Sequence, residues 1–296
     1  MSAAASASGS ASLGARLRGW AMNPWARAHF LWLIAIAYVV WTLMPVFIAV
    51  AFSFNAGKAQ TTWQGFSLTR WYLDDVNSVW KDETLRSALF QSLKLSSLTV
   101  LIAVPFGVGF ALALDRWQAR SASAANFLML FSFITPEIAI GVGLFLMFTQ
   151  LVSGIGLGFK AQLFGLSMFE MAYPLIVVRA RMLSIGKQYE EAAMDLGATP
   201  IGAIRRVLLP MLSPAIFASV AIVFASAIDN FVISQRLSVN ASTQTIPIII
   251  YSSARRSPLP SLNALATVTL VSSTVIIAAA ALVYRRFTRI ERSTAG

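Results

Sequence analysis

Six long apolar stretches separated by polar segments limit the folds that this chain can adopt. Hydrophobic residues make up 57% of the 296 residues and charged residues only 12%, whereas a soluble domain carries about 25% charged residues. About 20 consecutive apolar residues form a helix that crosses the hydrocarbon of a bilayer. The sequence therefore predicts an all-α integral membrane protein with six transmembrane helices, near residues 30–54, 88–114, 126–152, 162–183, 214–235 and 264–284.

A low-complexity tail and a basic segment precede the first apolar stretch. Residues 1–14 consist of Ala, Ser and Gly apart from Met1 and Leu13, a composition typical of disorder. The first stretch is longer than the roughly 7–15 residues of a signal-peptide core, so we expect it to remain as a membrane helix. The predicted organisation is a disordered, basic N-terminus over 1–29, a transmembrane domain over 30–290 and a short tail over 291–296.

The basic residues predict the orientation. Fourteen of the 23 Lys and Arg residues fall in segments that are cytoplasmic if the N-terminus is inside. In the long outer loop, 55–87, four basic residues are balanced by four acidic ones. Cytoplasmic loops carry the excess of Lys and Arg, so we expect both termini inside. The net charge of +11 is then a topology signal rather than a sign of nucleic-acid binding.

The composition leaves little material for catalysis. There is no cysteine, which excludes disulfides, thiolate metal sites and cysteine nucleophiles. The single histidine, His29, lies just before the first span, far from any serine that it would have to activate. No glycine-rich phosphate loop of the GxxxxGK[ST] type is present. We expect a non-catalytic protein that binds no metal.

The segment 189–210, between the fourth and fifth spans, has the pattern of a polar helical hairpin. Gly197 is placed to end a first helix in the left-handed conformation. Thr199 can cap a second helix, on which Ile201, Ile204 and Leu208 are expected to share one face. Such a hairpin suits docking onto a cytoplasmic partner, although the spacing alone fits a plain connecting loop equally well.

This hairpin resembles the EAA loop of ABC importer permeases. In that loop Glu-Ala-Ala is followed by three residues, a Gly, nine residues and Ile-x-Leu-Pro. In this chain Val207 stands at the Ile position. The resemblance implies a type I importer permease fold in which the hairpin inserts a coupling helix into an ATPase subunit. ATP and Mg²⁺ would then bind to that subunit, and this chain would bind no cofactor. The residues assigned to ATPase coupling are Glu190, Glu191, Ala192, Ala193, Gly197, Leu209 and Pro210.

Residues 30–290 resemble, more closely, the permeases of spermidine/putrescine-type importers. The segments that carry this resemblance are Trp63–Tyr72, Pro136-Glu-Ile, Asp229-Asn-Phe-Val-Ile-Ser and Asn263-Ala-Leu-Ala-Thr. The resemblance implies a subunit of the bacterial inner membrane with three kinds of partner: a second, non-identical permease, two ATPase subunits and an extracytoplasmic binding protein. The binding protein would dock on 55–87 and on the segment 244–260. Two positions depart from the family, because Asn230 and Ser261 stand where acids are usual.

Three acids within or beside apolar spans favour a cationic solute. Glu137, Glu170 and Asp229 would each cost about 2.5–3.5 kcal/mol at a helix centre without a partner. A polyamine could neutralise them in turn, whereas the alternative is that each acid caps a kinked helix or pairs across a subunit interface. The residues predicted to line the substrate path are Asp229, Glu137, Asn230, Ser226 and Glu170.

Other solutes and another mechanism stay open at this stage. The fewer acids at positions 230 and 261 also fit a smaller or less charged solute, such as an aminophosphonate, an opine or an amino acid. A secondary transporter that needs no ATPase would require an internal repeat or a coupling-ion site. The sequence shows no convincing repeat, which disfavours that alternative.

Overall fold

The structure is a computed structural model that describes residues 28–59, 61–116, 127, 134–152, 154–256 and 260–294. The chain divides into two compact units, 1–51 and 52–296, which are described separately. Within the described residues, five helices are long and apolar enough to cross a membrane, and a sixth apolar stretch, Glu137–Leu151, is shorter. This confirms the predicted helical membrane fold. Part of the predicted third span, and the predicted N-terminal tail apart from residues 28 and 29, lie outside the described residues.

Helix α2 (Ala28–Phe52) supplies the whole described part of the first unit. None of the side chains in its apolar segment Leu31–Phe52 is buried within the structure. A helix that is apolar on all sides needs a surrounding that is also apolar. The first predicted span is therefore suited to lipid or to another membrane helix.

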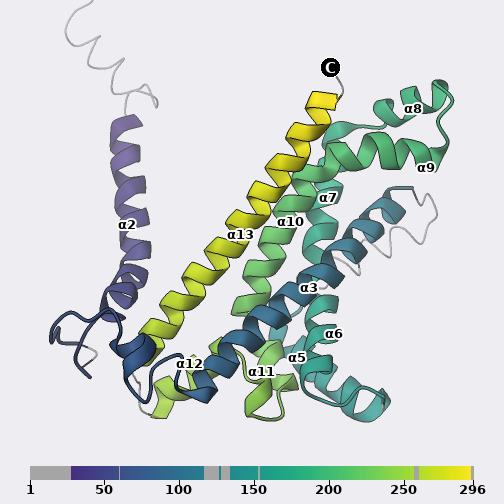
Figure 1. The fold of residues 1–296 in the computed structure, drawn as a ribbon. Helices are drawn as coiled ribbons and strands as arrows, with labels where there is room; N and C mark the ends of the chain where they lie inside the picture. Colours follow the sequence, from purple (N-terminus) through teal and green to yellow (C-terminus); the bar gives the residue numbers. More distant parts are fainter. Residues whose placement is uncertain are drawn as a thin grey trace, which may run out of the picture. The chain divides into compact units, whose positions relative to one another are not determined.

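Three helices form the main core of the second unit (Figure 1). They are α3 (Glu83–Arg116), α7 (Ala172–Ile185) and α10 (Leu209–Asp229), which bury Val108, Val178 and Leu212 between them. Gly107 allows the close approach of α3 to α7, because an added Cβ there would lie 2.5 Å from Pro174 Cγ and 2.6 Å from the carbonyl oxygen of Met171. A residue without a side chain at this position permits the close packing of the two helices.

A second cluster lies at the end of this unit opposite to α8 and α9 (Figure 1). It joins the N-terminal part of α3 to α5 (Glu137–Leu146), the π-helical turn η3 (Met147–Leu151), α6 (Phe159–Glu170) and α11 (Val232–Leu237). The fully buried Gln162 of α6 connects three of these elements. It accepts a hydrogen bond from Gln91 Nε2 (3.1 Å) and donates to the carbonyls of Ser234 (2.9 Å) and Thr243 (2.8 Å).

The remaining elements surround this end of the unit. The loop after α2 contains the π-helical turn η2 (Arg70–Asp74), whose Trp71 is buried against α12 (Ile246–Arg256) and α13 (Ser261–Thr294). A short 3₁₀ turn, η5 (Ala241–Thr243), lies between α11 and α12. Helix α13 supplies the predicted sixth span, Ser261–Arg285 in the structure.

The predicted fourth and fifth spans are interrupted. The fourth changes from α6 to α7 at Met171, and the fifth ends at Asp229 instead of 235. The second break follows from the side chain of Asn230, whose Oδ1 accepts hydrogen bonds from the backbone N–H groups of Ile233 (3.1 Å) and Ser234 (3.3 Å). Asn230 therefore starts a new helix, α11, inside an apolar run of residues that the sequence predicts to be one uninterrupted helix.

Candidate functional site

The hairpin 189–210 forms as the sequence predicts. Helix α8 (Gln188–Asp195) is followed by Gly197, whose left-handed backbone (φ +88°) terminates the helix. The N–H of Ala198 bonds to the carbonyl of Ala193 at 3.0 Å. Thr199 Oγ1 then accepts a hydrogen bond from the N–H of Gly202 at 3.1 Å and caps α9 (Pro200–Ala203). The left-handed glycine and the threonine cap are both confirmed.

The two glutamates of the hairpin lie in different environments. Glu190 is only 7% exposed and pairs with Arg116, the last residue of α3, whereas Glu191 is exposed. Adjacent helical residues point in different directions, which explains the difference. The tip of the hairpin presents two large apolar side chains to the outside, Leu196 at 90% exposure and Ile201 at 77%.

The other predicted coupling residues lie along the same segment. Ala192 is exposed and Ala193 half-buried on α8, while Leu209 is half-buried and Pro210 exposed at the start of α10. The predicted common face of Ile201, Ile204 and Leu208 is wrong, because Ile201 is exposed and Leu208 is buried. The π-helical turn η4 (Ile204–Leu208) widens the helix and rotates the following residues away from the expected face.

At the opposite end of the unit, Glu137 and Asn230 meet. Asn230 Nδ2 donates a hydrogen bond of 2.6 Å to Glu137 Oε1, and Glu137 is the first residue of α5 after Pro136. The bond explains one departure from the family pattern. An aspartate at position 230 has no proton to donate at neutral pH and would repel Glu137, whereas the amide satisfies it.

Glu170 and Asp229 complete the group of predicted path residues. Glu170 is fully buried, accepts a hydrogen bond of 2.8 Å from Ser226 Oγ, and leaves its second oxygen without a partner. Asp229 is exposed at the end of α10, and none of the described side chains bonds to it. The structure thus pairs Glu137 with Asn230 and Glu170 with Ser226, and leaves Asp229 accessible.

The polar group coincides with three helix breaks. Glu137 follows the break before α5, Glu170 precedes the change from α6 to α7, and Asn230 separates α10 from α11. Broken helices at such sites offer polar backbone and carboxylates at membrane depth, where an ionic solute needs them. None of the described basic side chains forms an ion pair with Glu137, Glu170 or Asp229. In the same described residues, no three potential metal ligands come together.

Sequence reasoning missed two residues that organise these sites. They are Arg116, which pairs with Glu190, and Gln162, which bonds to Ser234 and Thr243. The isolated amide of Gln162 within the apolar fourth span was the signal available, because a buried amide requires partners. For Arg116, the sequence offers no signal that selects Glu190 over its neighbours.

Comparison with known structures defines the class of protein to which this fold corresponds. The chain of a bacterial alginate ABC transporter, solved in complex with its alginate pentasaccharide-bound periplasmic protein, matches with a TM-score of 0.69 at 21% identity, covering 92% of this chain and 98% of that one. A chain of the MetNI methionine ABC transporter matches with a TM-score of 0.55 at 18% identity, covering 70% and 95%. The fold is that of a type I ABC importer permease.

Residues 103–289 match the family described as binding-protein-dependent transport system inner membrane component, and the chain belongs to this family. It is 32% identical to the putrescine transport system permease protein PotI of Escherichia coli K12, over 81% of this chain and 85% of that protein. It is 30% identical to the spermidine/putrescine transport system permease protein PotC of the same organism, over 86% and 93%. The protein is therefore an inner-membrane permease subunit and not an enzyme.

Proposed function

We propose that this chain forms part of the membrane path of an ATP-driven importer for a polyamine of the putrescine or spermidine class. Relatives that carry those names cover most of the chain. The observation that carries the proposal is the group of Glu137, Glu170 and Asp229 at three helix breaks, without a basic partner among the described residues. Cations with several ammonium groups can neutralise several carboxylates at once, which a monovalent cation cannot.

The hairpin is the proposed docking element for the ATPase. Leu196 and Ile201 expose large apolar side chains at its tip, and Glu191 is exposed on α8. Exposed apolar side chains rimmed by polar residues are typical of protein interfaces. In the proposed complex two ATPase subunits bind ATP and Mg²⁺, and the positions Ala192, Ala193 and Gly197 keep the approach to the hairpin open.

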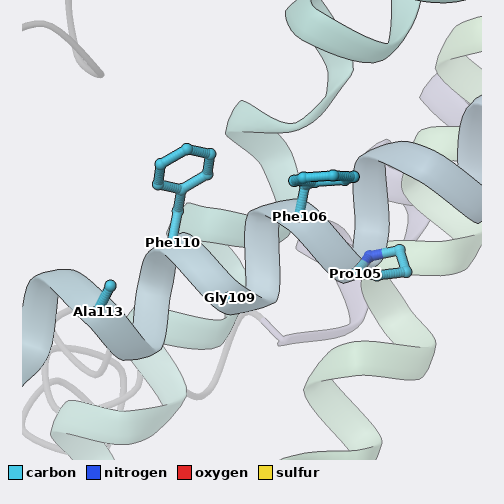
Figure 2. Close-up of a pocket in the computed structure, with 5 residues that line it drawn as sticks. All are labelled: Pro105, Phe106, Gly109, Phe110 and Ala113. Carbon is cyan, nitrogen blue, oxygen red and sulfur yellow. The ribbon is translucent and has the colours of Figure 1, made fainter.

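A second, non-identical permease is the proposed partner within the membrane. One face of α3 carries an apolar groove of about 390 Å³ lined by Pro105, Phe106, Gly109, Phe110 and Ala113. The rings of Phe106 and Phe110 project from the same side of α3, and Gly109 lies between these two residues along the helix (Figure 2). This face lies away from the main core, and small residues beside large ones permit close packing of a helix from another subunit.

Filling the groove is expected to weaken this pairing without affecting the fold. A Cβ added at Gly109 meets no other described part of the chain within 4 Å, so Gly109→Leu should leave the stability of the subunit unchanged while the partner permease is lost during purification. Gly107→Ala, two residues away, should do the reverse and destabilise the subunit by about 1–3 kcal/mol through overpacking. Thermal unfolding in detergent and co-purification measure the two effects. Retention of the partner by Gly109→Leu would exclude this groove as the interface.

The substrate assignment is tested by uptake into proteoliposomes that contain the full complex. Putrescine and butylamine have the same carbon chain and differ by one ammonium group, so the pair isolates the second charge. We expect ATP-dependent uptake of putrescine or spermidine, with little competition from butylamine. Uptake that is inhibited instead by neutral amino acids, opines or aminophosphonates would assign the subunit to another solute. Uptake without ATP would support a secondary transporter.

A further inference from the structure

The ion pair of Arg116 and Glu190 attaches the hairpin to α3. Arg116 is the last residue of α3, and Glu190 lies in the first turn of α8, with 37% and 9% of their side chains exposed. Beside them is a small polar pocket of about 80 Å³, which Asp115 and Lys187 also line. The contact is separate from the exposed tip of the hairpin, so a partner can bind the tip while the pair holds the hairpin to α3.

Helix α3 is a continuous element between the two ends of the unit. Its 34 residues correspond to a length of about 50 Å, which exceeds the roughly 30 Å of a bilayer's hydrocarbon. It runs unbroken through Pro105, and the close contact of Gly107 with α7 holds the following turn in place. A displacement at Arg116 therefore moves a packed helix and not a flexible loop.

The other end of α3 is connected by hydrogen bonds to Glu137, one of the three acids Glu137, Glu170 and Asp229, which are together called the carboxylate group. Gln91 of α3 bonds to Gln162, and Gln162 bonds to the carbonyl of Ser234 in α11. The N–H of Ser234 bonds in turn to Asn230, whose amide holds Glu137. Contiguous contacts thus lead from Glu190 to Glu137 across the whole unit.

We propose that Arg116 and Glu190 are positioning residues for transport, because they convert a displacement of the hairpin into a displacement of α3 and, through Gln162, of α11 and Asn230. The inference rests on the proposed docking of the hairpin on an ATPase. Contiguous networks carry coupling only where an element has two arrangements that both sites bias. In the proposed cycle, nucleotide binding selects one arrangement of α3 and thereby changes the surroundings of Glu137.

The test follows the far end of α3 while nucleotide binds at the ATPase. Because the chain has no cysteine, a fluorophore can be placed on Phe90→Cys, an exposed position near Gln91, in a complex with cysteine-free partners. AMP-PNP should change its emission in the otherwise unmodified complex. Arg116→Gln and Glu190→Gln should reduce that change about fivefold or more, the lower range of coupling between distant sites. The exchanged pair Arg116→Glu with Glu190→Arg should restore most of it.

Arg181→Gln is the matched control, because Arg181 is an exposed arginine of α7 with no bond to a described residue. It should respond like the unmodified complex. Three results would each overturn the proposal. The first is a full change in emission in Arg116→Gln and Glu190→Gln, and the second is no change in the exchanged pair Arg116→Glu with Glu190→Arg. The third is loss of the ATPase from either single variant. The absence of a response in the unmodified complex would overturn it as well. Putrescine uptake is measured separately, so a wrong substrate assignment is distinguishable from a wrong coupling contact.

Discussion

Asp229→Asn is expected to lower uptake of putrescine by roughly 10- to 100-fold, the effect of losing one charged hydrogen bond of about 1.5–3 kcal/mol. Asp229 is the accessible member of the carboxylate group, and no described side chain neutralises it. The substitution keeps the shape of the side chain and removes its charge. Initial rates of ATP-dependent uptake in proteoliposomes measure the effect, with the amount of assembled complex as a reference.

Arg181→Gln is the control for this prediction. Arg181 is an exposed charge on α7 and lies outside the group of Glu137, Glu170 and Asp229. Its substitution should leave uptake within about twofold of the unmodified complex, because surface charges have small effects. If Asp229→Asn transports at the normal rate, Asp229 does not line the substrate path, and Glu137 and Glu170 become the remaining candidates.

Leu196→Asp is expected to reduce ATP-dependent uptake by roughly 30-fold or more, as for the loss of an interface contact worth about 2 kcal/mol. Leu196 is the most exposed large apolar side chain of the hairpin tip, so a charge there does not disturb the packing of the subunit. The same variant should co-purify with less ATPase while the partner permease is retained. The measurement is uptake together with the ratio of subunits in the purified complex.

Glu191→Ala tests the polar part of the hairpin, and Arg181→Ala on α7 is a control for the loss of an exposed charge. Glu191→Ala should lower uptake, and Arg181→Ala should change it little. Undiminished uptake in both Leu196→Asp and Glu191→Ala would show that the hairpin does not transmit the work of the ATPase.

The sequence predicted the elements that depend on local chemistry. The left-handed Gly197 and the cap at Thr199 follow from residues that have few alternatives in a turn, and both form as expected. The apolar spans follow from composition and length, and the structure contains them. The predicted individual path and coupling residues remain predictions, because their roles depend on molecules other than this chain.

Features that depend on tertiary contacts could not be predicted. The break at Asn230 requires its side chain to turn back to Ile233 and Ser234 while it bonds to Glu137, 93 residues earlier in the chain. The separate environments of Glu190 and Glu191 are set by Arg116, 74 residues away from Glu190. The π-helical turn at Ile204–Leu208 carries no pattern that distinguishes it from an ordinary helix.

Sidedness is the property on which an ATP-coupled permease most directly depends. Leu196 at the hairpin tip is 90% exposed, and Val76 in the loop between α2 and α3 is 81% exposed. Either residue can be replaced by cysteine, and the native chain, which has no cysteine, gives no background labelling. A membrane-impermeant maleimide should label Val76→Cys in intact spheroplasts. It should label Leu196→Cys only in inside-out vesicles from which the ATPase has been removed, because bound ATPase should protect this position. Labelling of Leu196→Cys from the outside of sealed spheroplasts would contradict coupling to a cytoplasmic ATPase.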